Sequence, residues 1–343
     1  MLSPIIKQSK IDNLRQLIDG ARNIVITTHL SPDGDALGSS LALCRVLAKM
    51  GKNVRVVTPD VPTATLMFLP GVKEVLAYTK YGELVEMLFG AANLIICLDF
   101  NDAHRVDRME HLLLKSRAAK VMIDHHKNPS DFTVLTISHP EISSTCMLLY
   151  RVLFQLGLST MIDKTVAECI YTGMMTDTGN FSYNSQDPDL YIVISDLLRR
   201  GINKDELYRL AFNVKKESQL RLNGYAIDQK LTIYPEHHAA SIVLTMEELA
   251  KYSYENGDTE GLVNVPLAIP GVEYVAFIRE GKEYMKISMR SVGDVPVNKF
   301  CSDYFNGGGH INAAGGEYYG TLAEAVSKFE EALPTFDEYI SKK

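Results

Sequence analysis

The sequence predicts an α/β protein of two domains: an N-terminal domain built on a parallel sheet with flanking helices, and a smaller α/β C-terminal domain. Two observations lead to this fold class. Early in the chain, short apolar runs rich in β-branched residues alternate with segments of helical periodicity, the pattern of a parallel sheet covered on both faces. The length of 343 residues also exceeds the size at which a single hydrophobic core usually stops growing.

The first domain is predicted to contain four short strands, at 24–28, 53–58, 94–98 and 120–123. The spacing of apolar residues predicts helices on either side of the first strand, at 11–21 and 37–50. Three of the strands lead directly into a chemically active side chain, namely His29, Asp99 and Asp124. Because ligands gather at the carboxyl ends of parallel strands, we expect a site at this edge of the sheet.

The chain is predicted to be mainly helical from residue 143 to about 230, apart from the polar loop TDTGNFSYNSQD at 176–187. Beyond this segment, alternating apolar residues predict strands of a second sheet at 239–245, 273–278 and 283–290. Helices are expected at 297–305 and 322–333. We place the domain boundary between residues 228 and 229, which gives domains 1–228 and 229–343.

Composition excludes several classes of protein. A net charge of −7 argues against a surface for long nucleic acid, which needs a dense basic face, but allows a small anionic substrate. The five cysteines are scattered without a CxxC pair, so free thiols in a reducing compartment are expected, not disulfides or a thiolate zinc site. No segment has the apolar length of a signal peptide core or a membrane span. We therefore expect a cytoplasmic protein.

The densest group of chemically active side chains is HLSPDGD at 29–35. Gly34 allows a sharp turn between Asp33 and Asp35, and two carboxylates separated by one residue can each face a different ion. The alternative is an ordinary polar turn that caps the next helix, where aspartate is common.

Three further segments carry candidate ligands. Asp99 follows the apolar run LIICL, where a carboxylate is costly unless it is paired or bound to a cation; a helix cap is the alternative. In Asp124-His125-His126 the neighbouring imidazoles of an extended chain point opposite ways, so one is expected to bind metal while the other faces substrate. Asp177 lies in TGMMTDTGNF, where an Asx-type turn is the alternative.

The combination of these segments is more specific than any one of them. Oxygen and imidazole ligands without thiolates favour Mn²⁺, with Mg²⁺ as the other candidate, over structural zinc. The ligands outnumber what one ion shared with water needs, so we predict two ions roughly 3.5–4 Å apart, bridged by one carboxylate. The predicted metal ligands are His29, Asp33, Asp35, Asp99, His125 and Asp177.

In chain order, the motifs HLSPDGD, LDFND, DHH and TDTGNF resemble the four N-terminal motifs of the DHH phosphoesterase superfamily. The segment FNGGGHINAAGG at 305–316 is similar to the glycine-histidine motif of the DHHA1 domain. The two resemblances cover nearly the whole chain and point to the nanoRNase/pAp phosphatase branch. They imply a DHH domain followed by a smaller DHHA1 domain, with the active site in the cleft between them.

The resemblance also implies individual roles. One ion would be bound by His29 and Asp33 and the other by Asp35, His125 and Asp177, with Asp99 bridging both. Asp124 would orient its neighbours, and His126 would face the substrate phosphate. In the second domain, substrate would be held by Arg290, Gly307, Gly308, Gly309 and His310. Without the resemblance, the triple glycine could be a flexible turn and Arg290 a solvated strand end.

Two other motifs have simpler interpretations. GGGHINAAGG lacks the G-x-G-x-x-G spacing of a dinucleotide-binding loop, so we reject that function. The segment Glu141–Thr145 is predicted to cap the helix that follows it, and it could also line the substrate cleft.

Together these observations predict a hydrolase that cleaves short oligoribonucleotides to nucleoside monophosphates and dephosphorylates pAp, using water activated between two ions. The alternatives are pyrophosphate or polyphosphate hydrolysis, dinucleotide phosphodiesterase activity, and a nucleotide-binding regulator with a silent metal site. The expected partners are short oligoribonucleotides and pAp, without long duplex nucleic acid or a membrane. A homodimer is a common arrangement for soluble enzymes, although no interface signal is visible in the sequence.

Overall fold

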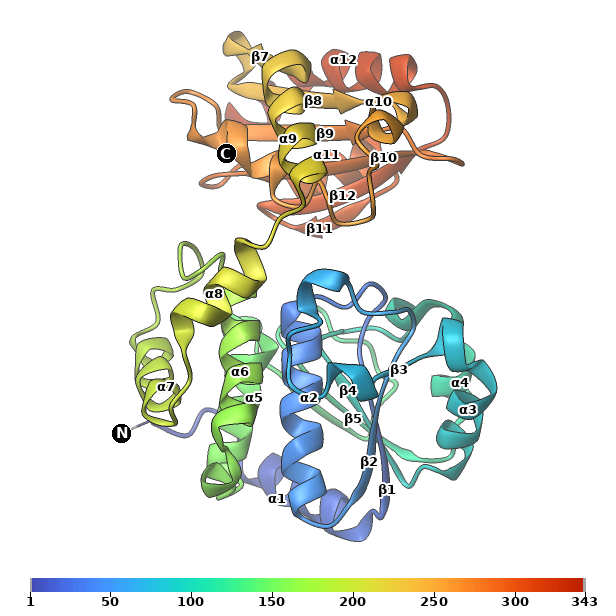
Figure 1. Ribbon diagram of the computed structural model, residues 1–343, viewed down its shortest axis with the longest axis vertical. Coiled ribbons are helices and arrows are strands. Elements are labelled where there is room, and N and C mark those ends of the chain that lie inside the picture. Colours follow the sequence, from blue (N-terminus) through green and yellow to red (C-terminus); the bar gives the residue numbers. More distant parts are fainter. Residues whose placement is uncertain (1, 342–343) are drawn as a thin grey trace. The chain divides into compact units, whose positions relative to one another are not determined.

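The protein is represented by a computed structural model in which residues 2–341 are described, and it forms two compact units (Figure 1). The first unit extends to Val214 and the second begins at Lys215. The boundary predicted between residues 228 and 229 lies near the end of helix α9 (Glu217–Lys230), and in the structure this whole helix belongs to the second unit.

The first unit contains a six-stranded parallel sheet with the strand order β3-β2-β1-β4-β5-β6. Its strands are β1 (Asn23–Thr27), β2 (Asn53–Thr58), β3 (Leu76–Ala77), β4 (Leu94–Leu98), β5 (Ala119–Asp124) and β6 (Leu135–Ser138). The central strands are apolar over most of their length, as expected for strands buried on both faces. The predicted α/β class and parallel sheet are confirmed. The sequence does not predict the short edge strands β3 and β6.

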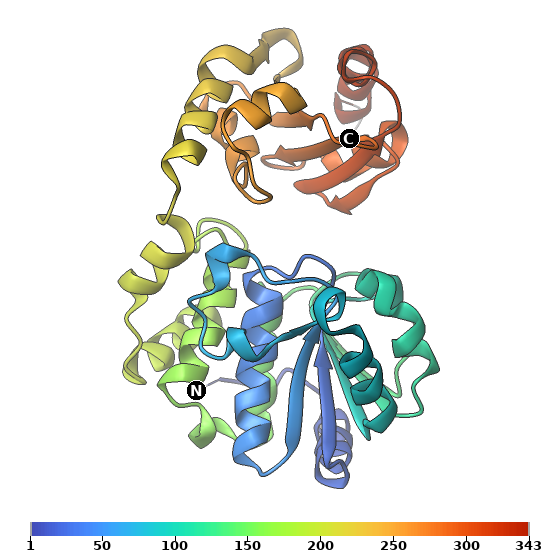
Figure 2. The same ribbon diagram turned by 45° about the vertical axis from the view of Figure 1, so that its right-hand side comes forward.

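Helices cover both faces of this sheet (Figure 2). Alternate residues of each strand supply two cores, since Ile26 and Ile96 face one layer of helices whereas Val25 and Ile95 face the other. On the first face, α1 (Gln8–Gly20), α2 (Gly34–Lys49) and α5 (Thr145–Gln155) pack on the sheet. Helix α6 (Lys164–Asp177) packs on α2 and α5, and α7 (Pro188–Arg199) and α8 (Lys204–Phe212) pack on α6 at the outside of the same core. The second layer contains α3 (Tyr78–Ala91) and α4 (Glu110–Lys115), preceded by the 3-10 helix η3 (Ala103–Met109).

The strand order identifies where a ligand should bind. After β1 the chain continues into α2 on one face, whereas after β4 it continues into η3 and α4 on the opposite face. The direction of the connections therefore reverses between the adjacent strands β1 and β4, and such a reversal opens a crevice at the carboxyl ends of the strands.

Helices α2 and α6 pack closely because glycines line their contact. A Cβ atom added at Gly34 would lie 2.3 Å from the Thr176 hydroxyl, and one at Gly38 would lie 2.5 Å from the Cys169 carbonyl oxygen. One at Gly173 would lie 3.0 Å from the Asp35 Cα atom of α2, and also 2.2 Å from the Cys146 sulfur of the neighbouring helix α5. The two helices run antiparallel, so the last turn of α6 lies beside the first turn of α2.

The second unit contains a mixed six-stranded sheet with the order β11-β12-β10-β9-β8-β7. Its strands are β7 (Leu231–Tyr234), β8 (Ala239–Leu244), β9 (Tyr274–Arg279), β10 (Met285–Ser291), β11 (Gly308–His310) and β12 (Ala313–Tyr318). Strands β8 and β9 pair in parallel, and the other neighbours pair antiparallel. One face packs on α11 (Val297–Tyr304) and α12 (Leu322–Ser341); the other is partly covered by α9, α10 (Met246–Lys251) and the 3-10 helix η6 (Leu262–Ala268).

The glycine-rich segment at 305–316 forms β11 and leads into β12, so the alternative of a flexible turn is wrong. A Cβ atom at Gly307 would lie 2.0 Å from the Gly315 carbonyl oxygen. At Gly309, where φ is 141°, it would lie 2.5 Å from the Ala313 carbonyl oxygen. These two glycines therefore permit the close approach of β11 to β12.

The remaining short 3-10 helices are η1 (Ala64–Leu66), η2 (Val72–Glu74), η4 (Ser159–Met161) and η5 (Pro235–His237). Within residues 2–341, no helix combines the length and the apolar character that crossing a membrane requires.

The glycine contact between α2 and α6 predicts a stability effect. Gly173→Ala should lower the free energy of unfolding by about 1–3 kcal/mol, because the new methyl group meets the Cys146 sulfur and the Asp35 backbone. Urea unfolding followed by circular dichroism measures the change. The matched control is Gly90→Ala in helix α3, where an added Cβ meets nothing within 4 Å. This control should be neutral or slightly stabilising; equal loss in both variants would contradict the packing argument.

Candidate metal centre

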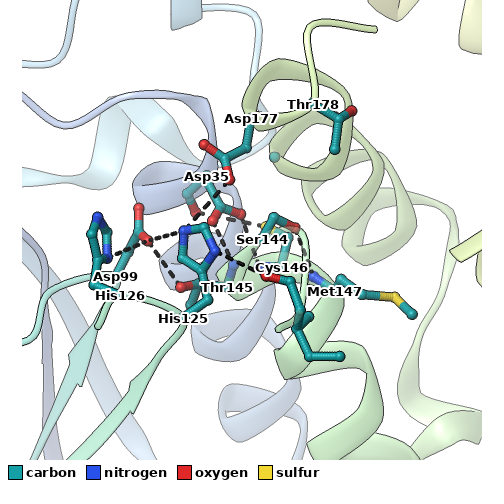
Figure 3. Close-up of polar contacts among 12 residues, drawn as sticks. Asp35, Asp99, His125, His126, Ser144, Thr145, Cys146, Met147, Asp177 and Thr178 are labelled. Atoms are coloured by element: carbon teal, nitrogen blue, oxygen red, sulfur yellow. Dashed lines mark hydrogen bonds and ion pairs between the residues drawn. The ribbon is translucent and has the colours of Figure 1, made fainter. Parts of the chain in front are cut away.

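The predicted ligands of the first unit meet at the carboxyl edge of its sheet. His29 follows β1, Asp99 follows β4, and His125 follows β5, so the three come from adjacent strands. Asp35 lies in the first turn of α2, and Asp177 is the last residue of α6. The antiparallel packing of these two helices brings both carboxylates to the same edge (Figure 3).

Three overlapping groups of side chains are close enough to share a metal ion, with one donor atom per residue and all donors within 4.8 Å of one another. The groups are His29/Asp33/Asp99, Asp35/His125/Asp177 and Asp99/His125/His126. The His29 Nε2 atom lies 3.5 Å from Asp99 Oδ2, and His125 Nε2 lies 3.4 Å from Asp177 Oδ2. Donor atoms that each bind one ion at about 2.0–2.2 Å have comparable separations. Asp99 occurs in two of the groups.

Groups at the N-terminus of α5 donate hydrogen bonds to two of the carboxylates (Figure 3). The backbone N–H groups of Thr145 and Cys146 donate to the two oxygens of Asp35 at 2.6 and 2.8 Å. The Thr145 hydroxyl donates to Asp99 Oδ1 at 2.9 Å. The Asp35 and Asp99 side chains belong to residues only 1% and 2% exposed, so these bonds replace water that the carboxylates have lost.

The sequence did not predict that Thr145 and Cys146 form hydrogen bonds with the carboxylates of the site. The prediction that Glu141–Thr145 caps a helix is confirmed, since the Ser144 hydroxyl accepts the Met147 N–H at 3.0 Å. That cap is the only signal in the sequence. The bonds to Asp35 join residues more than 100 positions apart, which no local pattern reveals.

The alternative interpretation of the aspartates as helix caps is correct for Asp33 but wrong for Asp99. Asp33 does cap α2, accepting the N–H groups of Asp35 and Ala36 at 3.0 Å, and it also belongs to the His29 group. Asp99 caps no helix; the cap of η3 is Asp102. Instead, Asp99 has a left-handed backbone with φ of 66°, uncommon for a residue with a side chain and tolerated best by Asn and Asp. Strain of this kind is concentrated at functional sites.

The two adjacent histidines are oriented by different partners. His125 Nδ1 lies 3.1 Å from the Ile142 carbonyl oxygen, which leaves its Nε2 directed towards Asp99 and Asp177. Asp124 accepts both the backbone N–H of His126 at 3.0 Å and a contact from its Nδ1 at 2.8 Å. Asp124 is fully buried, and these two contacts fix the orientation of the His126 ring.

The electrostatics of the site reflect crowded carboxylates. Burial, together with the negative charges of Asp99 and other nearby carboxylates, raises the pKa of Asp35 and of Asp177 well above the usual range. The pKa of Asp99 is lowered: burial opposes this, but the hydrogen bond and charge of His29 outweigh it. Burial likewise opposes charging of His29, yet the hydrogen bond to Asp99 and the charge of Asp33 raise its pKa to about 9. Cations bound at this edge would relieve the repulsion.

The predicted substrate residues of the second unit lie on its sheet. Arg290 is a half-buried residue of β10, and its Nη1 donates to the Met289 carbonyl oxygen at 2.9 Å. His310 is the exposed last residue of β11. Both pair with Ala313 of β12, so they share one face of the sheet.

The sequence matches known domain families in both units. Residues 23–174 match the DHH family, N-terminal domain, and residues 239–342 match the DHHA1 domain. The chain therefore belongs to the DHH/DHHA1 phosphoesterases, and the resemblance inferred from the motifs is confirmed.

Individual relatives extend this comparison. The chain is 32% identical to the bifunctional oligoribonuclease and PAP phosphatase NrnA of Thermus thermophilus, over 90% of this chain and 89% of that one. The structure of an exopolyphosphatase-related protein from Bacteroides fragilis superposes with a TM-score of 0.97 at 47% identity, covering 99% of this chain and 100% of that one. RecJ of Thermus thermophilus in complex with Mn²⁺ shares the fold, with a TM-score of 0.51 at 15% identity, over 98% of this chain and 55% of RecJ.

The crowding of carboxylates predicts a measurable instability of the metal-free protein. In EDTA at about pH 8, Asp177→Asn should raise the free energy of unfolding by about 0.5–2 kcal/mol. Folding raises the pKa of the Asp177 carboxyl, so ionising this group costs more free energy in the folded state than in the unfolded state. This cost is absent at pH values below the pKa that the carboxyl has in the unfolded chain. It grows as the pH rises through the pKa that the carboxyl has in the folded protein. The gain should therefore shrink towards about pH 5.

Thermal unfolding of Asp177→Asn measures this gain. The control is Asp131→Asn, an exposed aspartate of the same unit, which should change stability by less than about 0.5 kcal/mol. A loss of stability in metal-free Asp177→Asn would show that the carboxylate is held by attraction and not by crowding.

Proposed function

We propose that this protein hydrolyses short oligoribonucleotides to nucleoside monophosphates and removes a phosphate from pAp, with two divalent ions bound at the carboxyl edge of the first sheet. The observation that carries this proposal is the gathering of histidine and carboxylate donors from four separate chain segments around the buried Asp99. The similarity to NrnA of Thermus thermophilus supports the choice of substrates.

The donor set fits the proposed ions. One ion would be held by His29 and Asp33 and the other by Asp35, His125 and Asp177. Asp99 would be shared by both, since its two oxygens lie 3.5 Å from His29 Nε2 and 3.7 Å from His125 Nε2. Carboxylate and imidazole donors suit Mn²⁺, and Mg²⁺ remains the second candidate. When bound, such ions lower the pKa of water and neutralise charge on phosphoryl oxygens.

The chain's own groups complete the proposed chemistry. With its Nδ1 held by Asp124, the His126 ring can donate a hydrogen bond to a phosphate oxygen or a proton to the leaving oxygen. Thr145 and the N-terminus of α5 hold Asp35 and Asp99 in fixed positions, so the binding site needs little reorganisation. Arg290 and His310, with Gly307, Gly308 and Gly309 beside them, are proposed to bind the substrate phosphate.

The setting of the protein is also part of the proposal. All five cysteines are free thiols, and four of them are buried, which suits a reducing, cytoplasmic environment. The net charge of −7 favours small substrates over long nucleic acid. A homodimer is compatible with these features.

Polyphosphate hydrolysis, the activity of an exopolyphosphatase, is the second candidate function. It is favoured by the similarity to the exopolyphosphatase-related protein of Bacteroides fragilis, which is 47% identical to this chain. Both candidates use the same metal centre, so the substrate alone separates them.

A substrate comparison tests the proposal. The purified protein in Mn²⁺ should release nucleoside monophosphates from a short RNA and orthophosphate from pAp, because both substrates place a phosphate ester at the same centre. Products are followed by chromatography and a phosphate assay, with pyrophosphate and polyphosphate as parallel substrates. Turnover of polyphosphate or pyrophosphate alone would replace the first candidate with the second, and turnover of none would favour a nucleotide-binding regulator.

Two substitutions separate metal binding from substrate binding. Asp99→Asn should lower kcat more than about 100-fold and reduce bound Mn²⁺, while the Asn side chain tolerates the left-handed backbone. Arg290→Ala should raise KM roughly tenfold to 100-fold, from a lost charged hydrogen bond of about 1.5–3 kcal/mol, with Mn²⁺ binding unchanged. Calorimetric titration of Mn²⁺ provides the second readout; equal loss of metal in both variants would refute the assignment of roles.

A further inference from the structure

The loop that follows β1 is anchored on both sides of one peptide bond. On one side, the Ser31 N–H donates to Asp60 Oδ1 at 2.8 Å. On the other side, the Leu30 carbonyl oxygen lies 2.7 Å from His29 Nδ1. The Leu30 N–H is held as well, because it donates to the Arg105 carbonyl oxygen at 2.8 Å. The peptide unit that joins Leu30 to Ser31 is therefore fixed in its orientation.

The contact between His29 and Leu30 decides which nitrogen of the imidazole carries a proton. A carbonyl oxygen can only accept a hydrogen bond, so the Nδ1 atom of His29 is the donor. The Nε2 atom is then the one that can offer a lone pair, and it lies 3.5 Å from Asp99 Oδ2 and 3.9 Å from Asp33 Oδ1. Histidines that bind metal ions usually have their other ring nitrogen held by an acceptor in this way.

Asp60 acts on this contact from the far side of the peptide bond. The Leu30 carbonyl group and the Ser31 N–H group belong to one planar trans unit, so they point in opposite directions. Because Asp60 holds the N–H group, the carbonyl oxygen is directed towards His29. A charged acceptor on the N–H group also polarises the peptide and makes its oxygen a stronger acceptor. Asp60 therefore influences the imidazole without touching it.

The backbone conformation of Ser31 shows that the loop depends on Asp60. Ser31 has a left-handed backbone with φ of 53°, which residues with a side chain rarely adopt. Such a conformation persists only where the surrounding structure imposes it. The Ser31 hydroxyl donates to Asp60 Oδ2 at 3.2 Å, in addition to the bond from its N–H to Oδ1. Both oxygens of this carboxylate thus hold the same residue.

The sheet places Asp60 beside the loop. Asp60 follows β2, which pairs in parallel with β1 through Val57 and Thr27. The hydroxyl of the buried Thr58 donates to the Asp60 carbonyl oxygen at 2.8 Å, which fixes the chain where it leaves β2. The position of Asp60 is therefore a consequence of strand order and not of the motif around His29.

The second histidine of the proposed metal centre is held by a different part of the chain. His125 Nδ1 lies 3.1 Å from the Ile142 carbonyl oxygen, which belongs to the segment before α5 and not to the loop that Asp60 holds. A change at Asp60 is therefore expected to affect the ion at His29 and not the ion at His125.

We propose that Asp60 is a positioning residue of the metal centre, which acts through the Leu30–Ser31 peptide to keep His29 in the tautomer whose Nε2 atom binds an ion. This inference deepens the proposed function and rests on it for the assignment of His29 as a metal ligand. Asp60 is not itself a ligand in this assignment. Its effect is confined to one half of the centre.

Titration of the metal-free protein with Mn²⁺ tests this role by calorimetry. The unaltered protein should bind two ions. Asp60→Ala should weaken one of them about tenfold to 100-fold, the usual effect of losing an outer partner of a metal-binding histidine, and leave the other unchanged. Asp60→Asn should have an intermediate affinity, because its amide oxygen still accepts the Ser31 N–H but carries no charge.

Double variants identify the ion that is affected. In His29→Gln, the ion that still binds should be insensitive to a further Asp60→Ala change, because the residue through which Asp60 acts is gone. In His125→Gln, the remaining ion should be weakened by Asp60→Ala as strongly as in the single variant.

Asp163→Ala controls for a general loss of stability. Asp163 caps α6 at the end opposite to Asp177 and accepts the Val166 N–H at 3.0 Å. Loss of this cap should lower the midpoint of urea unfolding, as removal of a helix cap does. The affinity for Mn²⁺ should remain that of the unaltered protein.

The outcomes separate this inference from the proposed function. Unchanged affinity for both ions in Asp60→Ala would overturn the inference even if the protein hydrolyses RNA. Equal weakening of both ions, or weaker Mn²⁺ binding in Asp163→Ala as well, would mean that Asp60 only stabilises the fold. Selective loss of one ion, together with no hydrolysis of RNA or pAp by the unaltered protein, would support the inference while the proposed function fails. No Mn²⁺ binding by the unaltered protein would overturn both.

Discussion

The burial of several carboxylates at one edge of a sheet is the constraint on which the first unit depends. Like charges in a poorly solvated place repel one another, and the chain accepts this cost at Asp35 and Asp177. At Asp99 the neighbouring histidines, His29 above all, outweigh the cost of burial. The N-terminus of α5 offsets part of it, because the helix dipole and unpaired N–H groups there favour negative charge. The repulsion that is not offset makes this edge of the sheet favourable for cations even when no ligand is bound.

The group of carboxylates forms only because distant parts of the chain are packed together. The parallel order of β1, β4 and β5 brings their carboxyl ends together, and the close contact of α2 with α6 adds the two helix-borne aspartates. Neither condition suffices alone, since the strands supply the histidines and Asp99 while the helices supply Asp35 and Asp177. The rigidity of the site is therefore a property of the whole unit and not of one loop.

Local patterns in the sequence predicted much of this structure. The strands β1, β2, β4 and β5 were visible as apolar runs, and His29, Asp99 and His125 were visible as polar residues directly after them. The edge strands β3 and β6 are too short to show a period, and β11 is glycine-rich, so pairing with β12 rather than side-chain alternation makes it a strand. The bond from Thr145 to Asp99 depends on tertiary packing, which periodicity and motif spacing do not contain.

The reversal of connections between β1 and β4 has a consequence for how such a unit can change over time. Because the two chain crossings leave in opposite directions, the topology itself provides a place for a ligand between them, without any dedicated insertion. The fold of the unit and its reaction are thus separable. A few side chains at the carboxyl edge of the sheet decide which reaction occurs. The sequences of the surrounding helices are free to diverge as long as these helices still fill the two cores. New specificities could arise by exchange of rim residues or of the partner unit, with the ion-holding framework inherited unchanged.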